Sequence, residues 1–394
     1  MAGTVVLGNV STEEVAPDER VIDMDDKIRM LDPDQTQYTT MTSRVSSRQA
    51  VREKVNWIEE ELFPNIVTNT TAQLNTDTVF PLTAGQGKVV QANDILRNMR
   101  TGEAIRIVSV ATDTVTVARA INGTPAAAAI NALDNWLVVG DAQPQGSDFP
   151  TPRYLARVMG FNYTQITRTT WGFTGTQTAI ELYGGREPAK EARRKAIEHK
   201  RKWENIGFFG ARSFSAAVPP ENEPRGTAGG LQEFIQSIKR DAAGPLTVDF
   251  FDTFVADVFA NGTDDKVLFA SPTVVASMSK WNRTGMGNYY EAPEGGKVHG
   301  VQINAFISGA YGYRIPVVVK KEWSKYPVAN KGYGGYAFLV DMNYVERRPL
   351  RDRDTKLLVN QQPKGKDTYN AEYMTEATYE ISVEKAHGIL FGVT

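Results

Sequence analysis

At 394 residues the chain exceeds the size at which a single hydrophobic core usually stops growing, so we expect more than one compact part. Its 44 basic and 46 acidic side chains give a net charge of -2, which excludes a global field that would attract nucleic acid or an anionic membrane. It has no cysteine, which excludes disulfides, thiolate metal sites and cysteine nucleophiles. No apolar run approaches the ~18 residues of a membrane span.

The N-terminal segment, residues 1–50, is predicted to be an extended arm. Acidic and polar runs at 12–20 and 23–27 alternate with scattered apolar residues. This segment has too little hydrophobicity to fold on itself, so we expect it to lie along another surface. Disorder is the alternative interpretation.

A small β module is predicted within residues 79–148. Short β-prone runs at 104–110, 114–117 and 136–139 are separated by residues typical of tight turns. Further β-prone runs, rich in threonine, lie on either side of this region. We therefore expect the module to be inserted at the tip of a two-stranded projection.

Residues 188–206 form the clearest predicted helix. Pro188 suits a first helical position, and Gly207 follows the last apolar residue. A narrow stripe, which includes His199 and Trp203, recurs at helical spacing, and the other faces are charged. The candidate inner-face or assembly contacts are the basic residues Lys190, Arg193, Arg194, Lys195, Lys200, Arg201 and Lys202. A solvated surface helix and a basic rod that faces an acidic partner both remain open.

The second half of the chain alternates helix and strand patterns, which indicates a compact α/β lobe. Helices are predicted at residues 231–239, 246–260 and 272–281, and strands at 266–270, 336–345 and 373–383. The last residues are apolar again, and we expect them to return to the core as a strand.

No arrangement of residues indicates catalysis. His199, His299 and His387 lack the spacing of metal ligands, and neither a nucleophile elbow nor a phosphate-binding glycine loop occurs. We therefore predict no catalytic site, no metal and no cofactor, and a protein that is not an enzyme.

A second charged stretch, residues 346–356, mixes both signs closely, which favours interlocking ion pairs between neighbouring subunits over a polyanion site. An exposed loop is the alternative. The candidate inter-subunit ion pairs involve Arg347, Arg348, Arg351, Asp352, Arg353 and Asp354.

The serial order of these parts resembles that of the major capsid protein of tailed bacteriophages, which has the Hong Kong 97-type shell fold. Several stretches are similar to the family found in podovirus-like heads. They are RTTWGFTGTQ at 168–177, YGGREPAKEARRKAIEHKRKWENIGFFG at 183–210, GTAGGLQEFI at 226–235 and EATYEISVEKAHGILFG at 376–392. The resemblance implies an α+β fold.

The resemblance also implies an assignment of parts. These are an N-terminal arm at 1–50, an extended loop at 51–178 with its β insertion at about 79–148, a peripheral domain at 179–225 with the spine helix, an axial domain at 226–335 and peripheral return strands at 336–394. It implies pentamers and hexamers that form an icosahedral shell around double-stranded DNA, starting from a procapsid. Separate scaffolding and portal proteins are implied partners, decoration proteins are left open, and no membrane is involved. The implied location is the virion, with assembly in the host cytoplasm.

Two rival functions remain open on the sequence alone. An encapsulin-like compartment shell would share the fold, whereas a glycan-binding or adhesin-like β protein would account for the β insertion and the aromatic content. For the shell function, replacing Lys195, Arg201 and Lys202 together by glutamate is expected to disturb assembly or packaging while the monomer stays folded.

Overall fold

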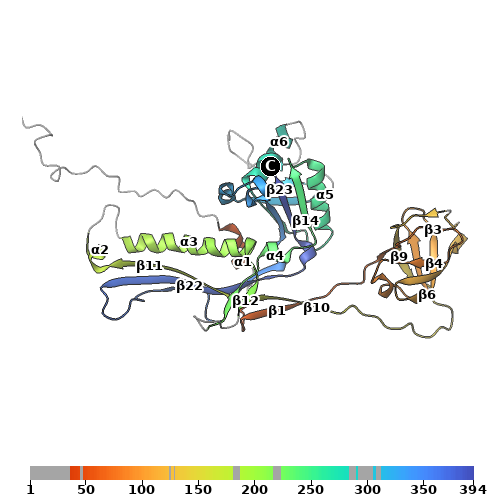
Figure 1. The fold of residues 1–394 in the computed structure, drawn as a ribbon, viewed down its shortest axis with the longest axis horizontal. Helices are drawn as coiled ribbons and strands as arrows, with labels where there is room; N and C mark the ends of the chain where they lie inside the picture. Colours follow the sequence, from red (N-terminus) through yellow and green to blue (C-terminus); the bar gives the residue numbers. More distant parts are fainter. Residues whose placement is uncertain are drawn as a thin grey trace, which may run out of the picture. The chain divides into compact units, whose positions relative to one another are not determined.

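The computed structural model describes residues 36–44, 48–123, 126–127, 129–180, 187–215, 223–283, 290–291, 305–307 and 312–394. The chain forms two compact units, of which unit 1 comprises Met1–Trp57 and Met159–Thr394 and unit 2 comprises Ile58–Val158. Strand β1 (Lys54–Glu59) pairs with β10 (Val158–Tyr163) where the chain leaves unit 1 and where it returns (Figure 1).

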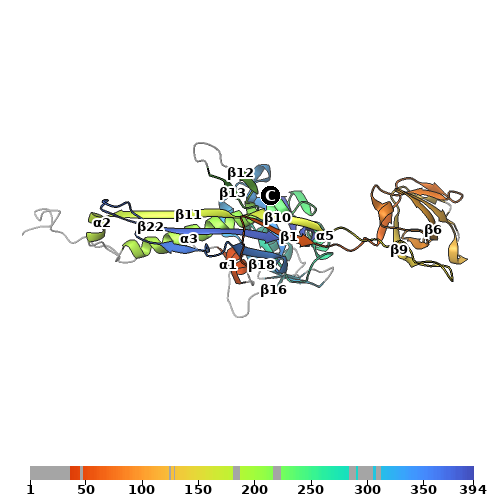
Figure 2. The same cartoon turned by 90° about the horizontal axis from the view of Figure 1, so that it is seen from below.

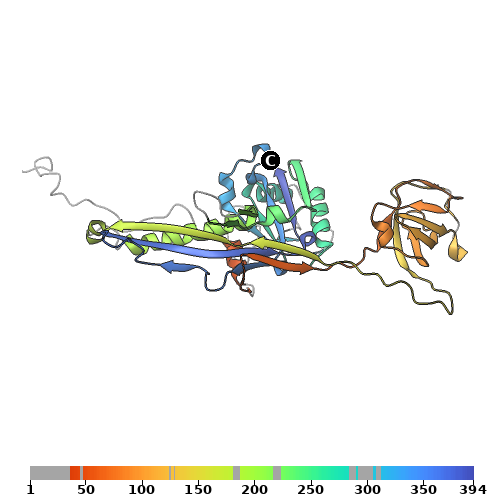
Figure 3. The same cartoon turned by 60° about the horizontal axis from the view of Figure 1, so that its bottom comes forward.

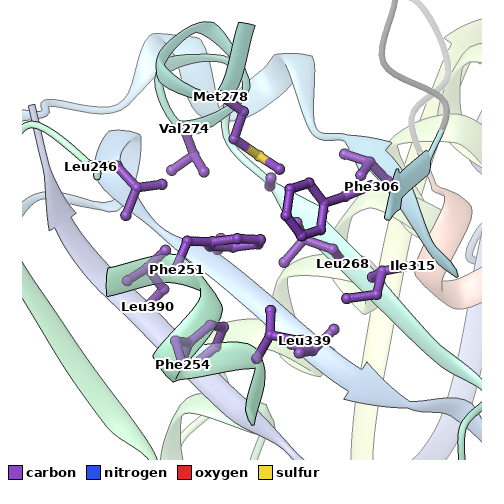
Figure 4. Close-up of a cluster of buried hydrophobic side chains, with 14 of the residues drawn as sticks. Leu246, Phe251, Phe254, Leu268, Val274, Met278, Phe306, Ile315, Leu339 and Leu390 are labelled. Atoms are coloured by element: carbon purple, nitrogen blue, oxygen red, sulfur yellow. The ribbon is translucent and has the colours of Figure 1, made fainter. Parts of the chain in front are cut away.

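The largest sheet of unit 1 has seven strands in the order β14-β23-β19-β15-β18-β17-β16. Their bounds are β14 Lys239–Gly244, β15 Lys266–Ala270, β16 Tyr290–Glu291, β17 Ala305–Ile307, β18 Arg314–Val319, β19 Ala337–Asp341 and β23 Gly388–Val393. Helices α5 (Val248–Phe259) and α6 (Pro272–Arg283) contribute Phe251, Phe254 and Met278 to the core on one face of the sheet (Figure 4).

This sheet is buried on both faces, which explains why its central strands are apolar at most positions, with Lys266 and Asp341 at their ends as exceptions. Leu268 and Leu339 are cross-strand partners in the core beneath α5 and α6. The next pair, Phe269 and Phe338, points into a second core that contains Trp203. Continuous apolar runs are typical of strands covered on both sides.

β19 and β23 come from residues 336–394, the segment expected to hold the peripheral return strands. Both pair within the seven-stranded sheet, next to β15 and β14, and not with β22. Their largely apolar composition suits a sheet that is covered on two faces. The apolar C-terminus does return to the core as a strand, as predicted.

The second sheet of unit 1 is four-stranded and supports the long helix. β22 (Thr368–Ile381) lies between β11 (Gln165–Thr174) on one side and β20 (Val345–Pro349) and β21 (Lys356–Leu358) on the other. The β11–β22 register is unbroken over ten residue pairs. α3 (Glu187–Phe209) lies along β11 and β22 in both Figures 1 and 2, and the two strands run side by side in Figure 3.

α3 extends past its predicted end at Ile206. Gly207, predicted to terminate the helix, lies inside it, and a side chain there would come within 2.3 Å of the Tyr38 ring. Glycine is therefore needed at this position for close packing. In the sequence, a glycine required for packing cannot be told apart from a glycine that ends a helix.

His199 joins α3 to both long strands. Its Nδ1 lies 3.0 Å from Thr169 Oγ1 on β11, and its Nε2 lies 2.8 Å from Thr375 Oγ1 on β22. Burial, together with the charges of Lys202 and Arg347, lowers the pKa of His199 to about 4. The imidazole is therefore neutral at pH 7, and it holds the helix to the sheet through two hydroxyl groups.

The described part of the N-terminal arm contains α1 (Gln37–Arg44), which is fixed to α3 by a buried carboxylate. Glu204 Oε1 accepts from the Tyr38 amide at 3.0 Å, and Oε2 accepts from the Thr39 amide at 2.7 Å. Lys320 Nζ donates to the same carboxylate at 2.5 Å, and both charged side chains are almost fully buried. A negative charge at a helix N-terminus also interacts favourably with the helix dipole. Residues 1–35 of the predicted arm lie outside the described residues.

Shorter elements complete unit 1. They are α2 (Gly175–Ala179), β12 (Ser213–Ser215), β13 (Arg225–Thr227) and α4 (Leu231–Phe234), with 3-10 turns at Lys321–Lys325, Ala329–Lys331, Tyr333–Gly335, Met342–Tyr344 and Glu384–Ala386. α4 is shorter than the helix predicted at 231–239, because the chain enters β14 at Lys239.

Unit 2 has a core of its own. Its main sheet has the order β2-β9-β5-β6-β7-β4, and β3 pairs with β8 separately. The bounds are β2 Ile66–Thr68, β3 Gln73–Leu74, β4 Val79–Pro81, β5 Asp94–Asn98, β6 Ala104–Ala111, β7 Thr114–Ala118, β8 Ala129–Ile130 and β9 Asn135–Asp141, with 3-10 turns at Gln86–Lys88 and Ile121–Gly123. Phe80 and Trp136 pack inside, with ring centroids 5.6 Å apart. The predicted module at 79–148 lies within this unit, which also includes β2 and β3 before it.

No helix among the described residues is long and apolar enough to cross a membrane.

We predict that a fragment spanning residues 58–158 folds alone, because its core is built from its own side chains. In that fragment Ile105→Ala should cost about 2–5 kcal/mol of unfolding free energy, since Ile105 is fully buried. Val108→Ala on the same strand should cost under about 0.5 kcal/mol, since Val108 is 52% exposed. Urea denaturation measures both changes. Equal losses, or a fragment without a cooperative transition, would contradict an independent core.

We predict strong coupling between Glu204 and Lys320. Glu204→Gln or Lys320→Met alone leaves one buried charge without its partner, which should cost about 3–5 kcal/mol. The double variant should cost clearly less than the sum, because neither charge remains. Urea unfolding of the four proteins gives the coupling free energy, and additive losses would show that the pair does not act as a unit.

We predict that stability falls as the pH is lowered from about 6.5 to about 4. Burial lowers the pKa of His387 as well as that of His199 to about 4, whereas an unfolded histidine titrates near 6.5. In this window the unfolded chain binds protons that the native chain does not, so each histidine removes at most about 1.4 kcal/mol per pH unit. Urea midpoints measured across this range should fall less steeply for His199→Gln than for the native chain. An equal slope would contradict the assignment to His199.

Candidate assembly surfaces

The seven basic residues singled out on α3 fall into two groups. Lys190, Arg193, Arg194 and Lys200 are exposed, and we call these four the basic ridge. Within the described chain, the ion pairs of the ridge are those of Arg194 with Glu191 at 3.6 Å and Glu198 at 3.8 Å, on an arginine that is 66% exposed. Pairs this exposed contribute little free energy and leave the guanidinium accessible. The ridge is therefore an accessible cationic surface.

The other three basic residues have partners within the chain. Lys195 Nζ donates to Glu198 at 2.7 Å, and Arg201 forms an ion pair with Glu322 at 3.3 Å. Lys202 Nζ donates to the Arg168 carbonyl and to Thr169 Oγ1, both at 2.9 Å, on β11. Replacing these three by glutamate would disturb the fold as well as the surface. The substitution set expected to leave the monomer intact is therefore the basic ridge.

Helical spacing places the basic ridge and Glu204 on the same face of α3. Residues 190, 193, 197, 200 and 204 are three or four positions apart, so they form one stripe along the helix. The C-terminal end of the stripe is covered, because α1 docks on Glu204. The exposed basic part is the continuation of the surface that already holds the arm.

Most of the charged residues of segment 346–354 form ion pairs within the chain. Arg347 contacts Asp354 at 2.7 Å, Arg353 contacts Glu376 at 2.5 Å, and Arg348 contacts Glu380. Burial alone would raise the pKa of Asp354, but the hydrogen bond and charge of Arg347 outweigh burial and hold it below its ordinary value. Arg351 and Asp352 are exposed at the turn between these pairs. These two residues are the part of the predicted inter-subunit set that remains most available to a neighbour.

A row of three buried glutamates on β22 was missed at the level of sequence. Glu372, Glu376 and Glu380 are spaced by four, so on a strand they share the face that points away from Tyr373, Thr375 and Tyr379. An arginine pairs with each of them, and Arg168 contacts Glu372 at 2.7 Å. The regular spacing was the available signal, but it gives no information on burial.

Unit 2 and its connecting segment expose large apolar side chains. Residues 144–159 are exposed without interruption, and Phe149 and Tyr154 are 101% and 87% exposed. Leu62, on the outgoing segment, is 91% exposed. Three prolines, at 144, 150 and 152, favour an extended backbone here. Such a segment presents apolar area that a partner surface can cover.

The structure does not bring the histidines together. His199 lies between α3 and the long strands, and His387 lies beside β19, where its Nδ1 accepts from the Asp341 amide at 3.1 Å. His299 lies outside the described residues. Among the residues that are described, no group of three or more acidic or histidine side chains could hold a metal ion.

The chain is similar to capsid proteins in sequence and in fold. Residues 4–394 match the family described as SU10 major capsid protein. A major capsid protein of Pseudomonas phage PaMx41 is 30% identical over 171 residues, which are 42% of this chain and 40% of that protein. The alignment thus spans about two fifths of that relative's length.

Two solved structures share the fold over nearly the whole chain. The capsid of a native GTA particle matches with a TM-score of 0.51 at 9% identity, covering 98% of this chain and 99% of that chain. A chain of Mycobacterium phage Adephagia matches with a TM-score of 0.50 at 10% identity, covering 97% and 98%. The predicted α+β tailed-phage capsid fold is confirmed. Since the family match extends over residues 4–394, this protein belongs to the SU10 major capsid protein family.

Proposed function

We propose that the protein is the major shell subunit of a phage head, which self-assembles through pentamers and hexamers into an icosahedral shell around double-stranded DNA. The observation that carries the proposal is the family match over residues 4–394. The role is structural and not enzymatic, and its place is the virion, after assembly in the host cytoplasm.

The surface of the chain supports assembly. A shell subunit needs contacts with several neighbours at once, and extended segments supply contact area without a large preformed core. The exposed segment 144–159, with Phe149 and Tyr154, is such an element. Contact with another subunit would remove these apolar side chains from water, at about 25 cal/mol for each Å² of apolar surface.

The charged surfaces take separate roles in this proposal. The basic ridge faces polyanions, and phosphate contacts by lysine and arginine need no base readout. Arg351 and Asp352 lie on an exposed turn and are the proposed sites of ion pairing with a neighbouring subunit. The domain assignment implied by the resemblance, from the arm at 1–50 to the return strands at 336–394, is part of this proposal. Separate scaffolding and portal proteins are proposed partners.

The structure offers little support for the glycan-binding alternative. That alternative was motivated by the aromatic content of a β module, but Phe80 and Trp136 of unit 2 are buried in its core. Buried rings are not available to stack on a sugar. The encapsulin-like alternative shares the shell architecture and differs in its contents.

Electron microscopy of particles from cells that produce the chain together with the neighbouring phage head genes tests the proposal. We expect closed shells of pentamers and hexamers, and nuclease-protected double-stranded DNA in particles purified from phage-producing cells. Small soluble species under every condition would overturn the shell function. Closed shells that protect an enzyme cargo and no DNA would instead establish the compartment function.

A further inference from the structure

The chain's small net charge conceals a strong separation of charge between its N-terminal arm and the rest. Residues 1–35 contain nine acidic and three basic side chains, for a net charge of -6. The remaining residues therefore carry +4, because the whole chain carries -2. An arm of this composition is attracted to cationic surfaces of the body to which it is attached.

The arm joins the body on the stripe of α3 that carries the basic ridge. Thr36, where the description of the arm begins, is buried, and α1 follows it with its first amides bound to Glu204. Lys200 is one helical turn from Glu204 on the same stripe, and Lys190 is about 21 Å away at 1.5 Å per residue. An extended chain covers that distance in about seven residues. Acidic residues occur throughout positions 13–34, so several of them can reach every member of the ridge.

We propose that the basic ridge of α3 is the docking surface for the acidic N-terminal arm of the same chain. The occupant is residues 13–34, and the recognition is between the ridge's ammonium and guanidinium groups and the arm's carboxylates. Half-buried Ile197 lies on the same stripe as the ridge and offers an apolar contact to the valines and isoleucines of the arm. The arm then covers the surface that the proposed function assigns to polyanions.

Covalent attachment favours the arm over a free polyanion. A tethered segment experiences an effective concentration in the millimolar range, whereas a free ligand must bind from solution. The Glu204 carboxylate already fixes α1 on α3, so part of the conformational entropy that docking of the arm would cost has been lost beforehand. In the free subunit the ridge is therefore occupied, and nucleic acid gains access only where the arm is displaced.

Carbodiimide cross-linking of the purified full chain tests the occupant directly, because this reagent joins lysine amines to carboxylates only in contact. We expect Lys190 and Lys200 to be linked to acidic residues between 13 and 34, and the links to disappear in 1 M NaCl, where screening is strong. Lys364 and Lys366, exposed lysines of the same unit, serve as controls and should give no links to the arm. Links from the two ridge lysines to other carboxylates alone would overturn the proposal.

An equal mixture of light and heavy isotope-labelled chains identifies which copy supplies the arm. Links within one isotopic form support the chain's own arm. Links that combine a light and a heavy chain at the statistical frequency would overturn the intramolecular occupant and assign the ridge to the arm of a second copy.

Binding to a 30-base-pair duplex tests the masking. Replacing Glu13, Glu14, Asp18, Glu19, Asp23, Asp25 and Asp26 by their amides should tighten binding at least about tenfold at low salt and steepen its salt dependence, since up to four phosphate contacts become available. Adding Lys190→Gln, Arg193→Gln, Arg194→Gln and Lys200→Gln should remove the gain.

The matched control neutralises four other exposed basic residues, Arg97, Arg106, Lys364 and Lys366, and should retain most of the gain. An arm variant that binds DNA no tighter, or a gain that both sets of four substitutions reduce equally, would overturn the masking. These measurements use soluble subunits, so their failure leaves the shell function to be decided by imaging.

Discussion

The buried Glu204 carboxylate is the interaction on which the arrangement of unit 1 depends. It binds the first amides of α1, accepts the Lys320 ammonium, and belongs to the end of α3 that packs between them. An ionised carboxylate in such a place is costly unless its oxygens are satisfied, and here four donors, three from α1 and the Lys320 ammonium, converge on it. The positions of α1, of α3 and of β18, the strand before Lys320, therefore depend on one another.

The seven-stranded sheet extends this coupling, because adjacent residues of one strand serve different cores. Leu268 packs with α5 and α6, and its neighbour Phe269 packs with Tyr38 and Phe208 beside Glu204. A shift of one residue in β15 would exchange the two sets of side chains. The register of β15 thus determines both the packing of α5 and α6 on one face of the sheet and the packing of α3 on the other. The long strands are tied in separately, through His199 and its two threonines.

The sequence predicted what depends on local pattern and missed what depends on tertiary contact. α5 and β15 lie where the apolar spacing indicated, because each buries a face that its own residues define. Gly207 was misinterpreted because a helix end and a close approach both select glycine. The sequence pattern did not distinguish Glu204 from the other charged residues of the helix. Nothing in residues 188–206 shows that α1 and Lys320 meet there, since both come from distant parts of the chain.

The same limit explains the charged surfaces. Seven basic residues were assigned together, but only tertiary contacts separate Lys202, whose ammonium binds the Arg168 carbonyl of β11, from the exposed members of the ridge. Arg353 and Glu376 are 23 positions apart, so the sequence of segment 346–356 alone does not show that this arginine already has a partner within the chain. The spacing of Glu372, Glu376 and Glu380 was visible, yet the arginines that neutralise them come from β11, β20 and the turn after it.

The placement of the basic ridge is itself unfavourable for an isolated helix. Lys190 lies in the first turn of α3, where the helix dipole opposes positive charge, and Arg193 and Arg194 follow within the second turn. Glu191 and Glu198 offset this by only a few tenths of a kcal/mol per pair. Neutral or acidic residues at these positions would stabilise the helix, so stability does not account for the ridge. A surface that keeps cations at a position where they weaken its own helix is explained by an anionic partner, and the chain carries one such partner at its own N-terminus.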